Sequence, residues 1–511
     1  MAWHHDTRRT IPFRRDSDRL VGLMGGTRIR PHLSDPPIAI ALSRNGTKMD
    51  ISTAIKKSPM TRFQYLALTA CLLVLTIDGF DVFVMGFVLP HLPDGFFGSS
   101  AEKGYLLSAG LVGMTAGSLL LSPLGDRFGR RKLVLWCLVV NFIGMAASAM
   151  SPNVESLTLA RFVTGLGIGG MTASLTVLVQ EYSSEKRRNA VMGVYTIGFP
   201  LGSLIGGFIG TMLVSAFGGA WQAMFVFGAA ITGLAFILAL TVIPESIDFL
   251  VTANTAEARA EIVRVAAKLG NPAVDPDAPP AMADKADSTG SIRGLLAKGM
   301  YYRTLLTWVA YSCVMSMFYF ASFWTPELIR LSSGNADLGT TAGLILSLGG
   351  VVGALVFGVW TLKISALKLV WIAMLITALA IVAFASFFSQ PGIAIALTVV
   401  IGLFTFISIT GLMAVVPPLY PVRTRSTALG WMLGIGRMFS ISAPILVGYA
   451  LMVAAPRTLY FYAAVPMLVG AAVMYALWRH VRGEATSMSA IGTATQPVSR
   501  PAHGEDEVVS L

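Results

Sequence analysis

Charged side chains are scarce in this sequence, and their scarcity excludes most soluble folds. Asp, Glu, Lys and Arg together make up 13% of the 511 residues, whereas hydrophobic residues make up 54%. The mean hydropathy is +0.69. A soluble chain of this length needs a more polar composition to cover its surface. The protein is therefore expected to lie in a lipid bilayer.

Cysteine is also scarce, with three residues in the whole chain. Cys71, Cys137 and Cys313 all fall within long apolar runs, so neither a disulfide framework nor a metal-ligand spacing is visible. The sequence also lacks a nucleophile and base in a recognisable enzymatic arrangement. We therefore expect no metal, no cofactor and no enzymatic activity.

Long apolar runs dominate what remains of the sequence. An α-helix needs roughly 20 mainly apolar residues to cross a bilayer. Runs of this kind are predicted at 64–90, 101–123, 133–151, 156–181, 189–216, 221–243, 303–325, 339–362, 367–388, 392–417, 426–454 and 458–479. The pattern predicts an all-α membrane protein with twelve transmembrane helices.

The basic residues in the short loops predict the orientation of these helices, because Lys and Arg are retained on the cytoplasmic side. Loops on one side hold Arg127, Arg130, Arg131, Lys132, Lys186, Arg187, Arg188, Lys363, Lys368, Arg423 and Arg425, and loops on the other hold only Lys103, Arg330 and Arg457. Both termini are thus expected in the cytoplasm, with the chain in a bacterial-type inner membrane. The net charge of +11 is spread over many loops, so a nucleic-acid partner is not expected.

One long hydrophilic segment divides the spans into two sets of six. The expected organisation is a disordered cytoplasmic tail at 1–60, a first half at 61–243, a cytoplasmic linker at 244–302, a second half at 303–480 and a disordered tail at 481–511. The linker contains a helical piece, "EARAEIVRVAAKLG". An alternative for the first tail is a start codon assigned too far upstream of Met49.

The two halves resemble each other at an offset of 238 residues. This offset aligns Tyr182 with Tyr420 and Arg187 with Arg425. In each half the aligned residues lie at the junction between the fourth and fifth spans. Internal repeats in a membrane protein of two halves are typical of transporters, whose site lies near the middle of the bilayer between the halves.

Two acids interrupt the first span, "LTIDGFDVFVMGF". Asp78 and Asp81 are three residues apart and share a helix face near the middle of the bilayer. A charge at that depth costs about 2.5–3.5 kcal/mol on insertion scales, so two acids indicate a function. Because burial penalises the charged carboxylate, the pair is predicted to carry protons and to face a water-filled cavity. The alternative is that one acid caps or pairs within the bundle.

Two arginines and an aromatic segment are the candidates for binding a substrate. Arg437 lies about 12 residues into the eleventh span, and its planar guanidinium suits a carboxylate; a permanent salt bridge to an Asp is the alternative. Arg161, nearer the outer end of the fourth span, is a second candidate that could instead snorkel to the interface. Tyr319 and Trp324 could stack on an aromatic ring, or simply face lipid.

A charged loop follows the second span and has the sequence "SPLGDRFGRRK", residues 122–132. It resembles the loop signature of the major facilitator superfamily, with Ser122 where that family has its first Gly. The resemblance implies a gating role for Asp126, Arg127, Gly129, Arg130 and Arg131. Asp126 could cap or pair across neighbouring helix ends, and Gly129 permits a tight turn. A positive-inside anchor is the alternative for the arginines.

Three segments carry a narrower resemblance over about 60–480. They are "DGFD", "RFVTGLGIGG" with "EYSSEKRR", and "LYPVRTRSTALGWMLGIGRM". Together they resemble the aromatic acid:proton symporter family. The resemblance implies a major facilitator fold and uptake of a benzoate-like or hydroxybenzoate-like anion with protons. It also implies that Asp78 and Asp81 are needed for transport and that Arg161 and Arg437 match functional arginines of the family.

Other transport functions stay open at this stage. The fifth span, "GVYTIGFPLGSLIGG", partly resembles the glycine-proline motif of antiporters, which would favour proton-coupled export. A carrier of aliphatic organic acids is a further alternative. A membrane sensor is not expected, because the polar tail after Arg482 is too short for a signalling domain. The expected partners are an aromatic acid anion, protons and lipid, and the transporter is expected to act as a monomer.

Overall fold

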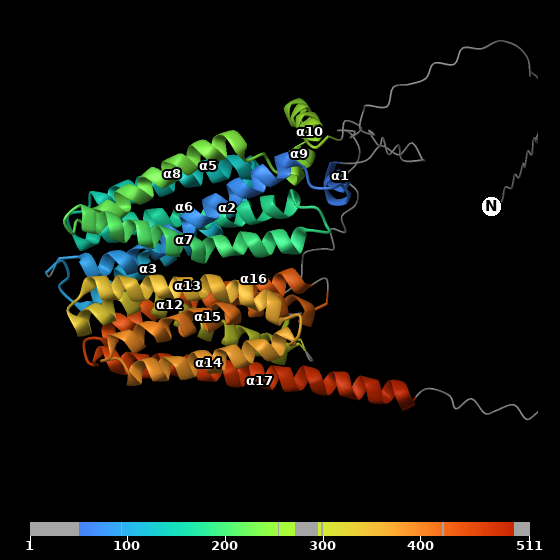
Figure 1. Ribbon diagram of the computed structural model, residues 1–511. Helices are drawn as coiled ribbons and strands as arrows, with labels where there is room; N and C mark the ends of the chain where they lie inside the picture. The colour runs from blue at the N-terminus through green and yellow to red at the C-terminus, as the bar shows by residue number, and fades with distance from the viewer. Residues whose placement is uncertain are drawn as a thin grey trace, which may run out of the picture. The chain divides into compact units, whose positions relative to one another are not determined.

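In the computed structural model all the regular secondary structure of the described residues is helical (Figure 1). The described residues are 51–93, 95–253, 255–270, 295–297, 300–421 and 424–494. Twelve of the helices are long and apolar enough to cross a membrane. The prediction of an all-α protein with twelve such helices is confirmed.

Six long helices make up what we call the first half of the bundle: α2 (Arg62–Val88), α3 (Ser100–Leu120), α5 (Arg130–Ala149), α6 (Val154–Glu181), α7 (Arg188–Ala216) and α8 (Gln222–Val242). Six more make up the second half: α12 (Tyr301–Ser333), α13 (Ala336–Trp360), α14 (Ala366–Ser386), α15 (Pro391–Val415), α16 (Arg425–Ala450) and α17 (Pro456–Ala494). The short helices are α1 (Ile51–Lys57), α4 (Ser122–Phe128), α9 (Ile247–Ala253) and α10 (Ala256–Lys268), with 3-10 turns η1 (Leu89–His91) and η2 (Pro417–Leu419).

The two halves repeat the same close helix packing. All the described helices belong to one compact unit, Lys48–Leu511, in which α3 packs on α6 and, in the second half, α13 packs on α15. A Cβ at Gly117 of α3 would come within 2.2 Å of the Leu166 carbonyl oxygen, and one at Gly353 of α13 within 2.2 Å of that of Leu403. Glycine therefore lets the second and fourth helices of each half approach backbone to backbone.

The aligned tyrosines both contact the first helix of their own half, although through different groups. Tyr182 donates its hydroxyl to the carbonyl of Glu245 at 2.8 Å, and its own carbonyl accepts from Gln64 at the start of α2 at 2.9 Å. Tyr420 donates its hydroxyl to Thr304 near the start of α12 at 3.1 Å. Each buried tyrosine thus ties the junction between the fourth and fifth helices to the helix that opens its half.

The ends of several elements differ from the sequence prediction. The seventh span was expected to end at residue 325, but α12 continues to Ser333 with Pro326 inside it. Proline and the charged residues that follow look like a helix end in sequence. In the structure Glu327 pairs with Lys103 of α3 and with Arg330 of its own helix.

The expected disordered tails also need correction within the described residues. Residues 51–57 form α1, in which Ile51 and Ile55 are buried and the Lys56 carbonyl accepts from the Glu185 amide at 3.1 Å. At the other end α17 continues to Ala494. The helical piece expected in the linker corresponds to α10. Residues 1–50, 271–294 and 495–511 lie outside the described part of the chain.

One buried ion cluster joins the two halves. Lys103 of α3 donates to Glu327 of α12 at 2.6 Å, and Arg330 donates to the same carboxylate through Nε at 2.8 Å and Nη2 at 2.9 Å. The Glu327 side chain is fully buried. Lys103 and Arg330 were assigned to loops from the sequence. In the structure both residues lie in helices, and both neutralise the buried acid Glu327.

The inter-half contacts close one end of the bundle. We call the end that carries α1, α4, α9 and α10 the basic end (Figure 1). Among the described residues, hydrogen bonds between the halves lie in the middle of the bundle or toward the opposite end, where Ser108 of α3 donates to the Ile441 carbonyl of α16 at 2.7 Å. At the basic end a groove of about 280 Å³ is lined by residues of α2, α6 and α7 with the Arg187 turn.

We expect Glu327→Gln to destabilise the protein strongly. Removing the acid takes the counter-ion away from the largely buried Lys103, and the loss of one partner of a buried pair costs about 3–5 kcal/mol. Glu261→Gln is the matched control, because Glu261 pairs with Arg264 at 3.2 Å in an exposed setting where a pair contributes at most about 1 kcal/mol. Thermal unfolding of the purified protein in detergent measures both. Equal unfolding temperatures for the two variants would contradict the assignment.

Candidate functional site

The two acids of α2 are completely buried and largely without hydrogen-bond partners. Asp78 and Asp81 both have 0% exposure. Asn141 of α5 donates to Oδ2 of Asp81 at 2.7 Å. The three other carboxylate oxygens have no hydrogen-bond partner within the described structure. Such groups are costly to keep charged away from water.

The neighbours of these acids all belong to the first half. A Cβ at Gly228 of α8 would lie 3.4 Å from Oδ1 of Asp81, and Thr172 of α6 faces Asp78. The pair was predicted to face a water-filled cavity. In this structure the side chains turn instead toward α5, α6 and α8, because α2 presents this face to the interior of its own half.

Arg161 is part of the same buried cluster. Its side chain is only 2% exposed, so it does not snorkel to the interface. Its Nη2 donates to the carbonyl oxygen of Asp81, and its Nη1 lies 3.1 Å from the Met145 sulfur. The guanidinium also lies 5.7 Å from the ring centroid of Phe225. The arginine therefore places positive charge beside Asp81 while bonding its backbone instead of its carboxylate.

A small cavity extends from Arg161 to the second half. Its volume is about 10 Å³, which is room for one water molecule. Met85 of α2 and Gly165 of α6 line it on the first-half side, and Phe323 of α12 lines it on the other. Arg161 thus connects the acidic pair to the boundary between the halves.

Arg437 lies on the boundary itself. From α16 its Nη1 donates to the hydroxyl of Ser118 on α3 at 2.5 Å. The hydroxyl groups of Tyr311 and Tyr319 are nearby. Within the described residues no carboxylate lies close enough to form an ion pair with Arg437. The alternative of a permanent salt bridge to an Asp is therefore not what the structure shows.

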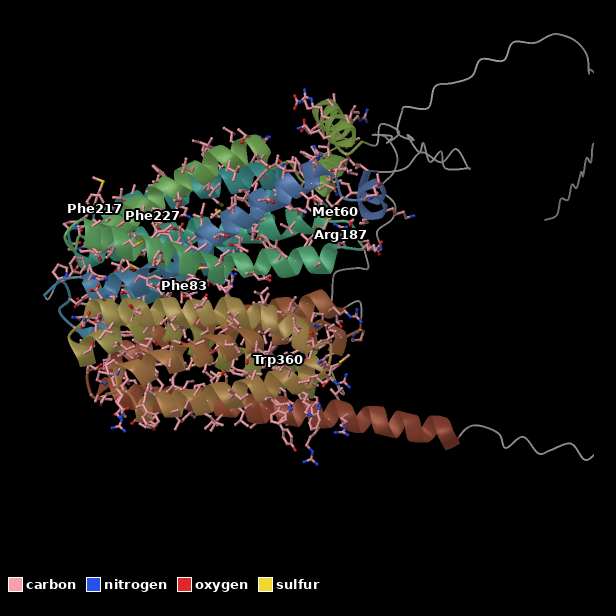
Figure 2. The ribbon with its side chains drawn as sticks, viewed as in Figure 1. Met60, Phe83, Arg187, Phe217, Phe227 and Trp360 are labelled. Atoms are coloured by element: carbon pink, nitrogen blue, oxygen red, sulfur yellow. The ribbon has the colours of Figure 1, made fainter. Side chains whose placement is uncertain are left out.

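Aromatic rings from both halves meet beside this arginine. Phe83 of α2 lies where the two halves face each other (Figure 2), and its ring centroid is 5.4 Å from that of Phe318, 6.4 Å from Tyr319 and 5.9 Å from Phe323. Tyr319 therefore lies in an aromatic cluster at the boundary. Trp324 is fully buried, and its indole nitrogen has no hydrogen-bond partner in the described structure.

Phe83 was missed in the sequence, although a signal for it was present. It follows Asp81 by two residues, which is about 200° around an α-helix. Since Asp81 points into the first half, Phe83 must point away from it. The spacing therefore records that Phe83 lies opposite Asp81, and the structure adds that this side of α2 is the boundary between the halves.

The charged loop forms a network confined to the first half. Arg130 pairs with Asp126 at 3.1 Å, with Glu181 at the end of α6, and with the hydroxyl of Ser246 at 3.0 Å. The Asp126 side chain is 74% exposed and reaches only the residue one turn later. Pairing of Asp126 across neighbouring helix ends was predicted. That role belongs to Glu181, which sequence reasoning missed.

The remaining loop residues hold the turn between α4 and α5. The Arg131 amide donates to Oε1 of Glu245 at 3.0 Å, and its guanidinium donates to the Leu240 carbonyl at 2.6 Å. Gly129 has φ 104°, a left-handed conformation that favours glycine. Arg127 lies over the Phe128 ring. Glu245 thereby ties this turn to the segment after α8.

Side chains that could bind a metal do not gather in the described part of the chain. Among the described residues, no group of three or more His, Cys, Asp or Glu side chains could hold a metal ion. The polar groups at the middle of the bundle are instead single acids, arginines and hydroxyls. They suit the binding of a proton and of a small anion.

Comparisons with known proteins identify the family and the fold of the chain. Residues 71–353 match the family model of the Major Facilitator Superfamily. A 4-hydroxybenzoate transporter, PcaK, of Pseudomonas putida is 31% identical over 405 residues, covering 78% of this chain and 88% of that protein. A gallate transporter of Pseudomonas putida is 29% identical, covering 79% and 89%. The fold of the xylose transporter XylE from E. coli, in a partially occluded inward open conformation, aligns with a TM-score of 0.67 at 15% identity, covering 81% and 98%.

We expect Gly129→Ala to destabilise the loop between α4 and α5. A Cβ there would lie 2.6 Å from Oε2 of Glu245, and the positive φ adds strain of about 1–3 kcal/mol. Gly358→Ala is the control, because a Cβ at that helical glycine meets nothing within 4 Å. The unfolding temperature should fall for Gly129→Ala and stay the same or rise slightly for Gly358→Ala. An unchanged temperature for Gly129→Ala would contradict this account of the turn.

Proposed function

The chain belongs to the Major Facilitator Superfamily, and we propose that it imports a benzoate-like or hydroxybenzoate-like carboxylate across the inner membrane together with protons. The observation that carries this proposal is the position of Arg437, between the halves and beside an aromatic cluster, with no acid paired to it in the described structure. The names of the relatives, transporters of 4-hydroxybenzoate, gallate and benzoate, support the same class of substrate.

The substrate anion is assigned to Arg437. A guanidinium offers five N–H donors in a planar fork that matches a carboxylate. Beside it, Tyr319 and Phe318 of α12 and Phe83 of α2 present ring faces and edges on which an aromatic substrate can stack. Because these rings come from both halves, a bound substrate would contact both halves at once.

Protons are assigned to Asp78 and Asp81. Both oxygens of Asp78 lack a hydrogen-bond partner in the described structure, so an uncompensated charge there would be unfavourable. A carboxylate in this setting suits a cycle in which it binds a proton when the site is wet and keeps it when the site is dry. Arg161 gives the acids a route to the boundary, since it bonds the backbone of Asp81 and lines the cavity shared with Phe323.

Alternating access is assigned to rocking of the two halves, 61–243 and 303–480, about this central site. The Lys103–Glu327 pair at the end opposite the basic loops would break when that end opens. By the positive-inside rule the basic end is cytoplasmic, which places both termini there. The loop at 122–132 would hold the first half rigid during this movement, and a monomer suffices for it.

Arg437→Lys should fail to restore uptake, because Lys offers a single point charge in place of the planar fork. Arg437→Ala should weaken the binding of carboxylate substrates about tenfold or more, while the binding of their neutral amides changes little. Competition for uptake by acid and amide pairs measures this preference. Arg457→Ala is the control, because Arg457 lies near the end of the bundle opposite the basic end. This variant should keep the wild-type preference for the acid over the amide. If Arg437→Ala keeps it too, Arg437 does not bind the anion.

The variants Asp78→Asn and Asp81→Asn should lose proton-driven accumulation. Asn mimics the protonated carboxylate permanently. A carrier with bound substrate could therefore still change between its two conformations, but this change would no longer depend on the proton gradient. Exchange of internal for external substrate should therefore persist in at least one of the two variants. Proteoliposomes with an imposed pH gradient, assayed beside counterflow, distinguish the two activities.

The exposed Asp337, in the first turn of α13, provides the matched control. Asp337→Asn should retain both accumulation and counterflow. If both first-helix Asn variants still accumulate substrate when the interior is alkaline, the acids do not carry the proton.

A further inference from the structure

A second small cavity lies at the boundary between the halves. Its volume is about 10 Å³, again room for one water molecule. Phe83 and Ser203 line it from the first half, and residues of α12, α13 and α15 line it from the second. The first cavity is lined mainly by apolar groups with Arg161, whereas this one has several hydroxyl groups around it.

The hydroxyl groups of this cavity have unused hydrogen-bonding capacity. Ser347 of α13 donates to the Gly343 carbonyl at 3.0 Å, so the 2.9 Å contact between Ser203 and Ser347 uses the hydrogen of Ser203. Both serine oxygens can therefore still accept. Thr405 of α15 is 2% exposed, and its hydroxyl has no partner in the described structure. The cavity thus offers both an unused donor and unused acceptors, which is what a hydroxyl group requires.

Three aromatic rings, those of Phe83, Phe318 and Phe406, also line the cavity. Phe318 meets Phe406 at a centroid distance of 5.3 Å and Phe83 at 5.4 Å, both nearly edge to face. Phe83 and Phe318 also belong to the cluster that contains Tyr319, beside Arg437. The aromatic cluster therefore runs between the arginine, at the seam of α3 and α16, and the hydroxyl cavity, at the seam of α7 and α13.

We propose that this cavity binds a hydroxyl group on the ring of the substrate, at a position away from the carboxylate. The inference rests on the proposed function, because it takes Arg437 as the partner of the carboxylate. A ring lying along the aromatic cluster directs its para or meta positions toward Thr405, Ser203 and Ser347. The cavity is too small for the ring itself but has the size of a single hydroxyl group.

A hydroxyl-binding cavity at this position should make the transporter prefer substrates with a ring hydroxyl group. A hydroxyl group of the substrate that replaces the water and forms the same hydrogen bonds increases the affinity. An unsubstituted ring leaves the buried hydroxyl groups of the protein bound to water or without a partner. We expect the wild-type protein to prefer 4- or 3-hydroxybenzoate over benzoate by about tenfold. The ortho isomer, 2-hydroxybenzoate, should gain nothing over benzoate, because its hydroxyl lies beside the carboxylate.

The test is competition by these four acids, unlabelled, against uptake of labelled 4-hydroxybenzoate in proteoliposomes. In Thr405→Val, which keeps the shape of the side chain but removes its hydroxyl, the preference for the 3- or 4-hydroxy acid over benzoate should fall to near one. The affinity for benzoate should stay unchanged. Ser347→Ala, at a half-buried position, provides a second variant with the same expected loss of preference if Thr405→Val folds poorly.

Thr398→Val is the matched control. Thr398 lies on the same helix, is 1% exposed, and donates its hydroxyl to the Ile395 carbonyl at 2.6 Å. Its variant should keep the wild-type preference. An unchanged preference in Thr405→Val and Ser347→Ala, or a wild type without preference, would overturn the hydroxyl site alone. Failure of all four acids to compete in the wild type would overturn the proposed function as well.

Discussion

The core of a bilayer offers no water to solvate a charge or a hydroxyl, so every polar group inside the bundle depends on partners from the protein. Glu327 shows the constraint satisfied, because two cations from different halves neutralise it. Arg161 is satisfied only in part, because a carbonyl, a sulfur and an aromatic ring contact its guanidinium while its Nε has no hydrogen-bond partner in the described structure. Asp78 and Thr405 are among the exceptions, since their side chains have no hydrogen-bond partner in the described structure. The proposed functions are assigned to these exceptions, where the transported species would supply the missing partner.

The proposed proton and substrate sites lie on different sides of α2. Asp78 and Asp81 turn into the first half, whereas Phe83 turns toward the second half and meets the aromatic side chains of α12. Because these residues lie within six positions of one helix, a change in the charge of an acid and a change in substrate occupancy act on the same rigid element. This shared helix gives a physical route for coupling. Arg161 adds a second one, because it contacts both the backbone of Asp81 and the cavity at the boundary.

The charged loop after α3 is held in place by acidic residues that lie far away in the sequence. The signature residues Arg130 and Arg131 are held by Glu181 and Glu245, which lie far away in the sequence at the ends of α6 and α8. Asp126 itself is exposed and contacts only Arg130. The network therefore joins helices within the first half, whereas the contacts between the halves include the Lys103–Glu327 pair, the seam of α3 and α16, the seam of α7 and α13 and the aromatic cluster of α2 and α12.

The sequence by itself determined the number of spans, their division into two halves and most of the candidate residues. Long apolar runs are unmistakable in composition, and the cost of burying charge makes Asp78, Asp81, Arg161 and Arg437 conspicuous. Only the tertiary structure decided which way those side chains point and which residues complete the site. The helices are apolar on nearly every face, so no polar stripe in the sequence records how each helix is rotated about its axis. Partners such as Thr405 and Ser203 come together only when the two halves pack.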